Sequence, residues 1–166
     1  MKKFIRVLGV TLSLVVLASC TPEENEIDTT PEVTPQSITG EYTYNVVLVA
    51  SGVDTDGDGK TNTNLMNETG KECVWDNIWS FKESTVTLYE KGAKCDASSP
   101  DILLNGTYEY NKTTKKLTIK DSQTGVEVDV LEDVLLEYDD YSKQTNLSFS
   151  VYDKDLKQSV RYVLKK

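Results

Sequence analysis

The stretch Asn146-Leu-Ser-Phe-Ser-Val-Tyr152 alternates large apolar and polar residues. In an extended chain, Leu147, Phe149 and Val151 point to one face, and the serines between them point to the other. This period of two predicts an antiparallel strand with one buried face and one solvated face.

Comparable short stretches recur on both sides of this strand. We predict further strands around 42–46 and over 75–81, 85–89, 103–110, 116–120, 126–138 and 159–164. Clusters of turn-forming residues separate several of them, at 111–115, 121–125 and 139–142. About eight evenly spaced strands predict an all-β fold, a single antiparallel up-and-down β-barrel, because closing the meander removes its exposed edges.

The N-terminus has the three zones of an export signal. Basic residues precede a short apolar run over 7–18, and the run ends in Leu17-Ala18-Ser19-Cys20. A permanent membrane helix needs about 20 apolar residues, so this pattern is typical of a removable signal. The tetrad resembles the lipobox of bacterial lipoproteins; the alternative is an ordinary secretory signal with an incidental cysteine. The resemblance implies a signal peptide over 1–19 and acylation (palmitate) at Cys20.

Residues 20–37 are interpreted as the lipidated cysteine and a disordered acidic tether. The stretch 21–37 has three prolines, five acidic residues and no basic ones, so it cannot bury enough apolar surface to offset its ordering entropy. The residue after Cys20 is not the aspartate associated with inner-membrane retention, which favours the outer membrane. The acidic residues after Cys20 also resemble the surface-export signals of Bacteroidota lipoproteins, so the cell surface is a candidate location.

The net charge limits the classes of partner, and the cysteine count indicates a disulfide. Cleavage at Cys20 removes three basic residues, so the formal net charge changes from −9 to −12. Such a surface repels nucleic acid, which we therefore exclude as a partner. Apart from Cys20, the chain has Cys73 and Cys95. An even pair in an oxidising compartment predicts a disulfide, and two buried free thiols are the alternative.

Several short motifs, taken in order, resemble the lipocalin-like lipoproteins of Bacteroidota. They are Ile38-Thr39-Gly40-Glu41-Tyr42, Cys73 before Asp76-Asn77, Trp79-x-Phe81, Gly92-x-Lys94-Cys95 and Gly106-Thr107-Tyr108. The resemblance covers most of 38–166. It implies a lipocalin-like barrel domain of eight strands, often with a ligand cavity, and no enzymatic activity.

A group of aromatic residues lies on or near the predicted strands and is a candidate for lining an apolar ligand pocket: Trp75, Trp79, Phe81, Tyr108 and Tyr110. Ligand pockets are mainly apolar with a few polar groups. The alternative is core packing, because small barrels fill their interiors with side chains.

The loop Asp54-Thr-Asp56-Gly-Asp58-Gly59-Lys60-Thr-Asn62 is a candidate calcium site. Carboxylates at positions one, three and five of a tight loop can converge on a hard cation, with the Lys60 carbonyl and Asn62 as further ligands. Leu65 stands at position twelve, where a bidentate glutamate belongs, and Glu68 comes three residues later. The alternative is an acidic, solvated loop.

Glu127-Val-Asp129-Val-Leu-Glu132 resembles the catalytic strand of laminarinase-like glycoside hydrolases, which need two carboxylates. In the alternative, Val126, Val128 and Val130 face the core, and Glu127 and Asp129 face water. The chain has no histidine, which excludes a Ser-His-Asp triad, a Cys-His pair and a histidine zinc site.

From the sequence we expect a membrane-anchored lipoprotein whose barrel over 38–166 binds a small apolar ligand without catalysis. The first alternative is a calcium-stabilised surface module that binds protein or glycan. A glycoside hydrolase is the second alternative.

Overall fold

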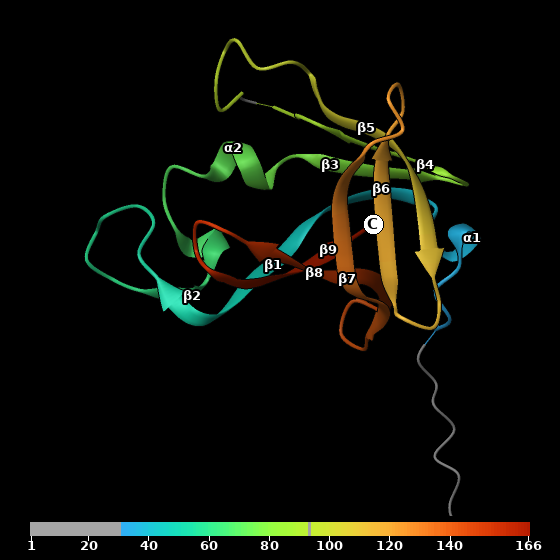
Figure 1. Ribbon diagram of the computed structural model, residues 1–166. Helices are drawn as coiled ribbons and strands as arrows, with labels where there is room; N and C mark the ends of the chain where they lie inside the picture. The colour runs from blue at the N-terminus through green and yellow to red at the C-terminus, as the bar shows by residue number, and fades with distance from the viewer. Residues whose placement is uncertain (1–30, 93) are drawn as a thin grey trace, which may run out of the picture.

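The computed structural model describes residues 31–92 and 94–166 (Figure 1). The predicted signal peptide, Cys20 and the first part of the predicted tether lie outside these residues. The strands are β1 (Gly40–Val53), β2 (Asn62–Asn64), β3 (Ile78–Lys82), β4 (Thr85–Tyr89), β5 (Ile102–Asn111), β6 (Lys116–Asp121), β7 (Glu127–Asp139), β8 (Gln144–Asp153) and β9 (Gln158–Lys165). The short helices are α1 (Pro35–Ile38), the 3-10 turn η1 (Leu65–Asn67) and α2 (Glu72–Trp75). No helix in this described part is long and apolar enough to cross a bilayer.

The strands form an antiparallel meander that closes on itself. Each strand from β3 to β9 pairs with the next, and β1 pairs with both β3 and β9. Short β2 pairs with the far end of β1, outside the closed circuit. The predicted all-β, up-and-down barrel of eight strands is confirmed, and its strand order is the lipocalin-like one.

Along β8 the apolar residues face inward as predicted, but the opposite face is not solvated throughout, because Ser148 is fully buried and Asn146 is nearly so. The Arg161 guanidinium of β9 donates a hydrogen bond of 3.0 Å to the Ser148 hydroxyl. Leu147 and Phe149 point inward and are fully buried, and Leu147 lies opposite buried Leu164 of β9. Equivalent inward positions on the other strands complete one core: Tyr42, Val47, Phe81, Val86, Leu117, Ile119, Leu131 and Val134. The closed sheet and this core cluster both lie within the described residues.

The segment 31–38 covers one end of the barrel, which we call the closed end. Ile38 is fully buried and Val33 is nearly so, and both belong to the core cluster. Glu32 forms an ion pair of 2.5 Å with Lys112, in the turn between β5 and β6. Residues 31–37, which we assigned to the tether from the sequence, therefore pack against the barrel.

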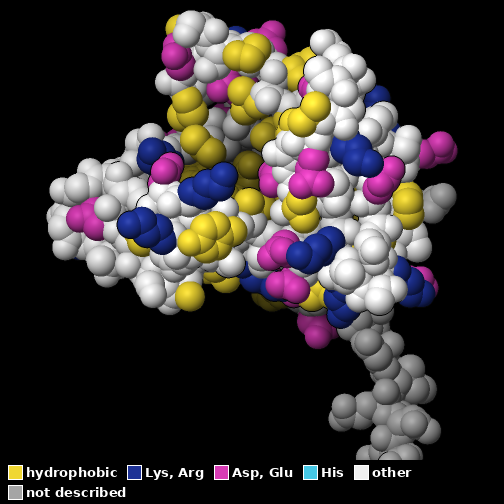
Figure 2. Space-filling model, viewed as in Figure 1, with side chains coloured by type: hydrophobic (Ala, Val, Ile, Leu, Met, Phe, Trp, Pro, Cys, Tyr) yellow, Lys and Arg dark blue, Asp and Glu magenta, His cyan; other side chains and the backbone are white. Residues whose placement is uncertain are grey.

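At the opposite end, the open end, the barrel wall separates between β7 and β8. The pairing of these strands begins at Glu132 and Ser150 and continues toward the closed end. Residues 127–131 of β7 pair with β6 instead. Figure 2 shows this face hollowed, with hydrophobic side chains lining the hollow.

Two local predictions were wrong. Trp75 belongs to α2, and the strand predicted over 75–81 begins at Ile78. The facing of the first part of β7 is also reversed, since Val126 and Val128 are more than half exposed whereas Asp129 is half-buried. Asp133 has a positive φ, and the register with β8 shifts between Glu132 and Leu135. A bulge there moves every residue before it to the other face.

Candidate functional site

The inner wall at the open end is apolar but incompletely covered. Its members are inward-facing residues that are partly exposed, one from each of five strands: Leu88, Leu104, Asp129, Val151 and Tyr162. The register supports their facing, because Leu88 pairs with Leu104, and Asp129 pairs with fully buried Ile119. A wall of this kind offers apolar contact surface that solvent still reaches, as ligand sites do.

Aromatic side chains form the floor beneath this wall. The Tyr44 ring lies 5.6 Å from the Trp75 ring and 5.9 Å from the Tyr162 ring, measured between centroids. The Nε1–H of Trp79 donates a hydrogen bond of 2.9 Å to the Tyr44 hydroxyl, which fixes the orientation of both side chains. Burial raises the pKa of Tyr44, so this phenol stays neutral at physiological pH.

A cavity of about 280 Å³ opens beside this floor. Its lining is apolar on the side of α2 and η1, with acidic groups from the turn between β8 and β9: Thr55, Leu65, Lys71, Val74, Trp75, Asp153, Asp155 and Leu156. Its volume lies near the lower limit of about 300 Å³ typical of small-molecule pockets. The indole N–H of Trp75 is buried and has no hydrogen-bond partner within the described residues. An oxygen atom on a bound molecule would satisfy this donor.

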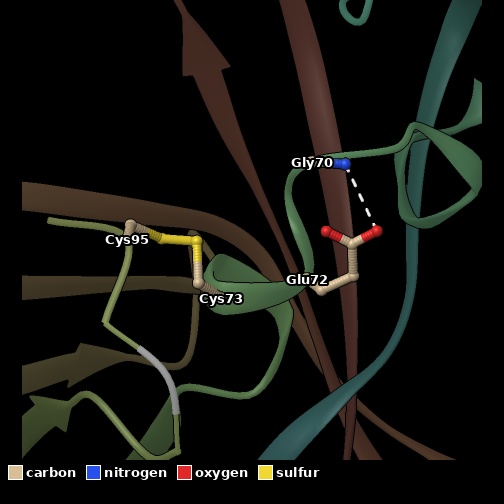
Figure 3. Close-up of a disulfide and its surroundings, with 4 residues drawn as sticks. All are labelled: Gly70, Glu72, Cys73 and Cys95. Carbon is tan, nitrogen blue, oxygen red and sulfur yellow. Dashed lines mark hydrogen bonds between the residues drawn. A yellow bond between two sulfur atoms is a disulfide. The ribbon is translucent and has the colours of Figure 1, made fainter.

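The disulfide predicted between Cys73 and Cys95 is present and holds α2 in place (Figure 3). It links α2 to the segment that leads into β5, across 22 residues of sequence. The first turn of α2 is also tied by a hydrogen bond of 3.2 Å from the Gly70 N–H to the Glu72 carboxylate (Figure 3). A helix of four residues has little stability of its own, so these links position Trp75 at the open end.

The five aromatic residues predicted to line one pocket lie at different levels of the barrel. Trp79, Phe81 and Tyr108 pack against one another in the core, with centroid distances of 6.0 Å and 5.6 Å along the series. Tyr110 lines a separate cavity of about 270 Å³ at the closed end, beside Glu32 and Lys112. Trp75 is the member of this group that lines the open-end cavity.

Asp129 is a site residue that we did not identify from the sequence. It comes from the strand considered as a glycosidase motif, but its carboxylate points into the barrel. Glu132 lies on the outer face and forms an ion pair of 2.5 Å with Lys116. The carboxylates of this motif are therefore divided between the two faces of the sheet. Asp133 lies at the bulge and has a positive φ. The sequence does not reveal this conformation, because glycine is the residue that clearly indicates a positive φ.

The loop between β1 and β2 brings the predicted calcium ligands together. The carboxylates of Asp54, Asp56 and Asp58 each offer an oxygen within 4.8 Å of the others. Asp54 also accepts hydrogen bonds from the Gly57 and Gly59 amides, at 2.7 Å and 2.9 Å. The Lys60 ammonium pairs with Asp58 at 3.2 Å. Three converging carboxylates fit a hard divalent cation.

The buried carboxylate of Glu68 accepts hydrogen bonds from this loop. Its side chain is 2 % exposed, and its Oε2 accepts hydrogen bonds from the Thr55 and Asp56 amides at 2.5 Å and 3.1 Å. Its Oε1 accepts a bond of 2.5 Å from the Asn62 side-chain amide. These bonds lower the pKa of Glu68, so the carboxylate is ionised at neutral pH. Asn62, a predicted calcium ligand, and Glu68 are thus engaged in hydrogen bonds within the protein.

Comparison of the chain with protein-family models, with curated proteins and with solved structures finds no match.

Proposed function

We propose that this protein is a lipid-anchored, non-catalytic binding protein that takes a small apolar ligand at the open end of a lipocalin-like barrel. The observation that supports it is the partly exposed apolar wall beside the cavity lined by Trp75. Elsewhere the barrel core is filled with fully buried side chains. The open end is thus the place where a guest molecule needs the least rearrangement of the core.

The chain enters the barrel at the end opposite the proposed ligand site. Pro31, the first described residue, lies at the closed end, where it lines the cavity beside Tyr110. A lipid on Cys20 would attach the protein to the outer membrane through the part of the chain that leads into the closed end. Stable anchoring requires more than one acyl chain, each buried methylene contributing about 0.8 kcal/mol.

Native mass spectrometry of residues 21–166, produced in an oxidising periplasm, tests the binding function. These residues include the closed sheet and its core, and they omit the lipid. We expect a bound apolar compound, or uptake of added 1-decanol, that Trp75→Ala and Leu88→Ala each weaken. A protein that takes up no apolar compound would contradict the proposal.

The anchor is tested separately in the full chain. Cells that express it are labelled with a palmitate analogue, and their membranes are then fractionated. We expect label in the outer-membrane fraction, and we expect Cys20→Ala to abolish it. Label that persists in Cys20→Ala would reject lipidation at this residue.

A second proposed property is calcium binding by the loop 54–62, favoured by the convergence of the three aspartates. The Lys60 ammonium and the hydrogen bonds already made by Asp54 compete with a metal, so weak affinity is expected, in the range of about 10⁻⁴ to 10⁻³ M that extracellular sites show. Calcium would replace the repulsion among these carboxylates with attraction and stabilise this part of the molecule.

Thermal unfolding of residues 21–166 with and without 5–10 mM calcium tests this second property. We expect a Tm increase of about 3–10 °C with calcium, and no increase in Asp58→Asn. Asp140→Asn removes one exposed carboxylate at the far end of β7 and should keep the response. An equal response in Asp58→Asn would place the calcium effect elsewhere.

A further inference from the structure

The apolar wall of the open end contains one carboxylate, Asp129, in a position that serves no evident structural purpose. It lies opposite Ile119, next along the inner face from Leu131, and both of these residues are fully buried. It also lies in the part of β7 that does not pair with β8, so a molecule entering the hollow can reach it.

No basic residue of the described chain pairs with Asp129. Its recorded hydrogen bond comes from the adjacent Val130 N–H, at 2.8 Å, and no lysine or arginine nitrogen of residues 31–92 and 94–166 lies within ion-pair distance. Burial raises the pKa of this carboxyl, because the charged form is less well solvated there. A half-buried charge with no counterion is costly, and the cost falls when a cation arrives.

The surroundings of Asp129 also favour a cation. Tyr162 lies on the inner face of β9, as Asp129 does on β7. Burial raises the pKa of Tyr162, and the charges of Tyr44, Asp153 and Asp129 raise it further. Asp153 also lines the cavity beside Trp75. Negative carboxylates and the faces of aromatic rings both attract an ammonium group. The apolar wall meanwhile suits a hydrocarbon chain.

We infer that the ligand is a cationic amphiphile, an apolar molecule with an amine, whose ammonium group binds Asp129 while its apolar part lies along Leu88, Leu104 and Val151. This inference rests on the proposed function, because it names the class of the ligand that the open end takes.

The experiment compares three probes with the same tail: decylamine, 1-decanol and decanoate. Their affinities for residues 21–166 are measured by calorimetry at pH 7.5, below the critical micelle concentrations. We expect decylamine to bind about tenfold tighter than 1-decanol, and decanoate to bind most weakly. In Asp129→Asn, decylamine should lose its tenfold advantage and bind about as tightly as 1-decanol.

Glu127→Gln is the matched control, since it removes an exposed charge from the same strand. Glu127→Gln should keep most of the amine preference. Asp129→Asn changes the shape of the side chain little, so we expect this variant to fold, and its unfolding transition verifies that it does. If 1-decanol and decylamine bind equally to the natural chain, the amine inference fails and the binding function stands. If Asp129→Asn keeps the preference, the inference also fails. If no probe binds, the binding function itself fails.

Discussion

The two ends of the barrel use the same kinds of residues for different purposes. At the closed end, Ile38, Phe81 and Tyr108 are buried, and the polypeptide segment 31–38 covers the opening. At the open end, equivalent inward positions such as Leu88 and Tyr162 remain partly exposed. That end is held by the Cys73–Cys95 disulfide. It is also held by the loop 54–62 together with Glu68, which we call the polar loop. Packing stabilises one end, and cross-links preserve an accessible surface at the other.

The strongest test of this contrast is to remove one large side chain from each end. Phe81→Ala should lower the free energy of unfolding by about 3–5 kcal/mol, because it leaves a cavity in the aromatic core. Leu88→Ala should lower it by about 1 kcal/mol, since that side chain is already partly exposed. Urea unfolding measures both. Equal losses would show that the two ends are packed alike.

The next largest effect concerns the disulfide. Cys73→Ser combined with Cys95→Ser should lower the free energy of unfolding by about 3 kcal/mol, because the link closes a loop of 22 residues. Uptake of 1-decanol should fall as well, since α2 no longer holds Trp75 in place. Unchanged ligand uptake in this variant would remove Trp75 from the site.

The polar loop provides a smaller effect that depends on pH. Hydrogen bonds from Asn62, Thr55 and Asp56 lower the pKa of Glu68 from its ordinary 4.5, so the folded state favours the ionised carboxylate. The resulting stability is fully present above pH 4.5 and is lost as the pH falls through the folded-state pKa. Glu68→Gln should lower the Tm at pH 7 by about 5 °C.

The difference in Tm between Glu68→Gln and the natural chain should shrink on acidification toward pH 3. Glu109→Gln, which removes an exposed partner of Lys120, serves as the control and should change the Tm little. A decrease in Tm in Glu68→Gln that is the same at pH 3 and pH 7 would show that the ionised carboxylate is not the cause of the stabilisation.

Asp129 should give the smallest effect, with the opposite sign. Burial raises its pKa above the ordinary 3.8, so its ionised form opposes folding at neutral pH. Asp129→Asn should therefore raise the Tm at pH 7 by about 2 °C, and this gain should vanish as the pH falls through the folded-state pKa. A lower Tm would mean that the carboxylate has a stabilising partner.

Much of the barrel could be predicted from the sequence, because the period of two in stretches such as 146–152 is a local property. The disulfide followed from cysteine count and compartment. The approach of the three aspartates followed from their spacing within one loop.

The open end could not be predicted, because its features depend on contacts between distant residues. The bulge at Asp133 reverses the facing of Asp129, and the disulfide keeps Trp75 in a helix where β propensity favours a strand. The separation of β7 from β8 is likewise a property of register. None of these leaves a periodic pattern in the sequence.

The central claim is that the open end is the ligand site. It is tested most directly by recording amide NMR spectra of ¹⁵N-labelled residues 21–166 during titration with 1-decanol. We predict saturable shifts centred on Leu88, Leu104, Asp129, Val151 and Tyr162, with the signals of Tyr42 and Phe81 at the closed end unchanged. Shifts centred on the closed end, or no saturable shifts at all, would contradict the claim.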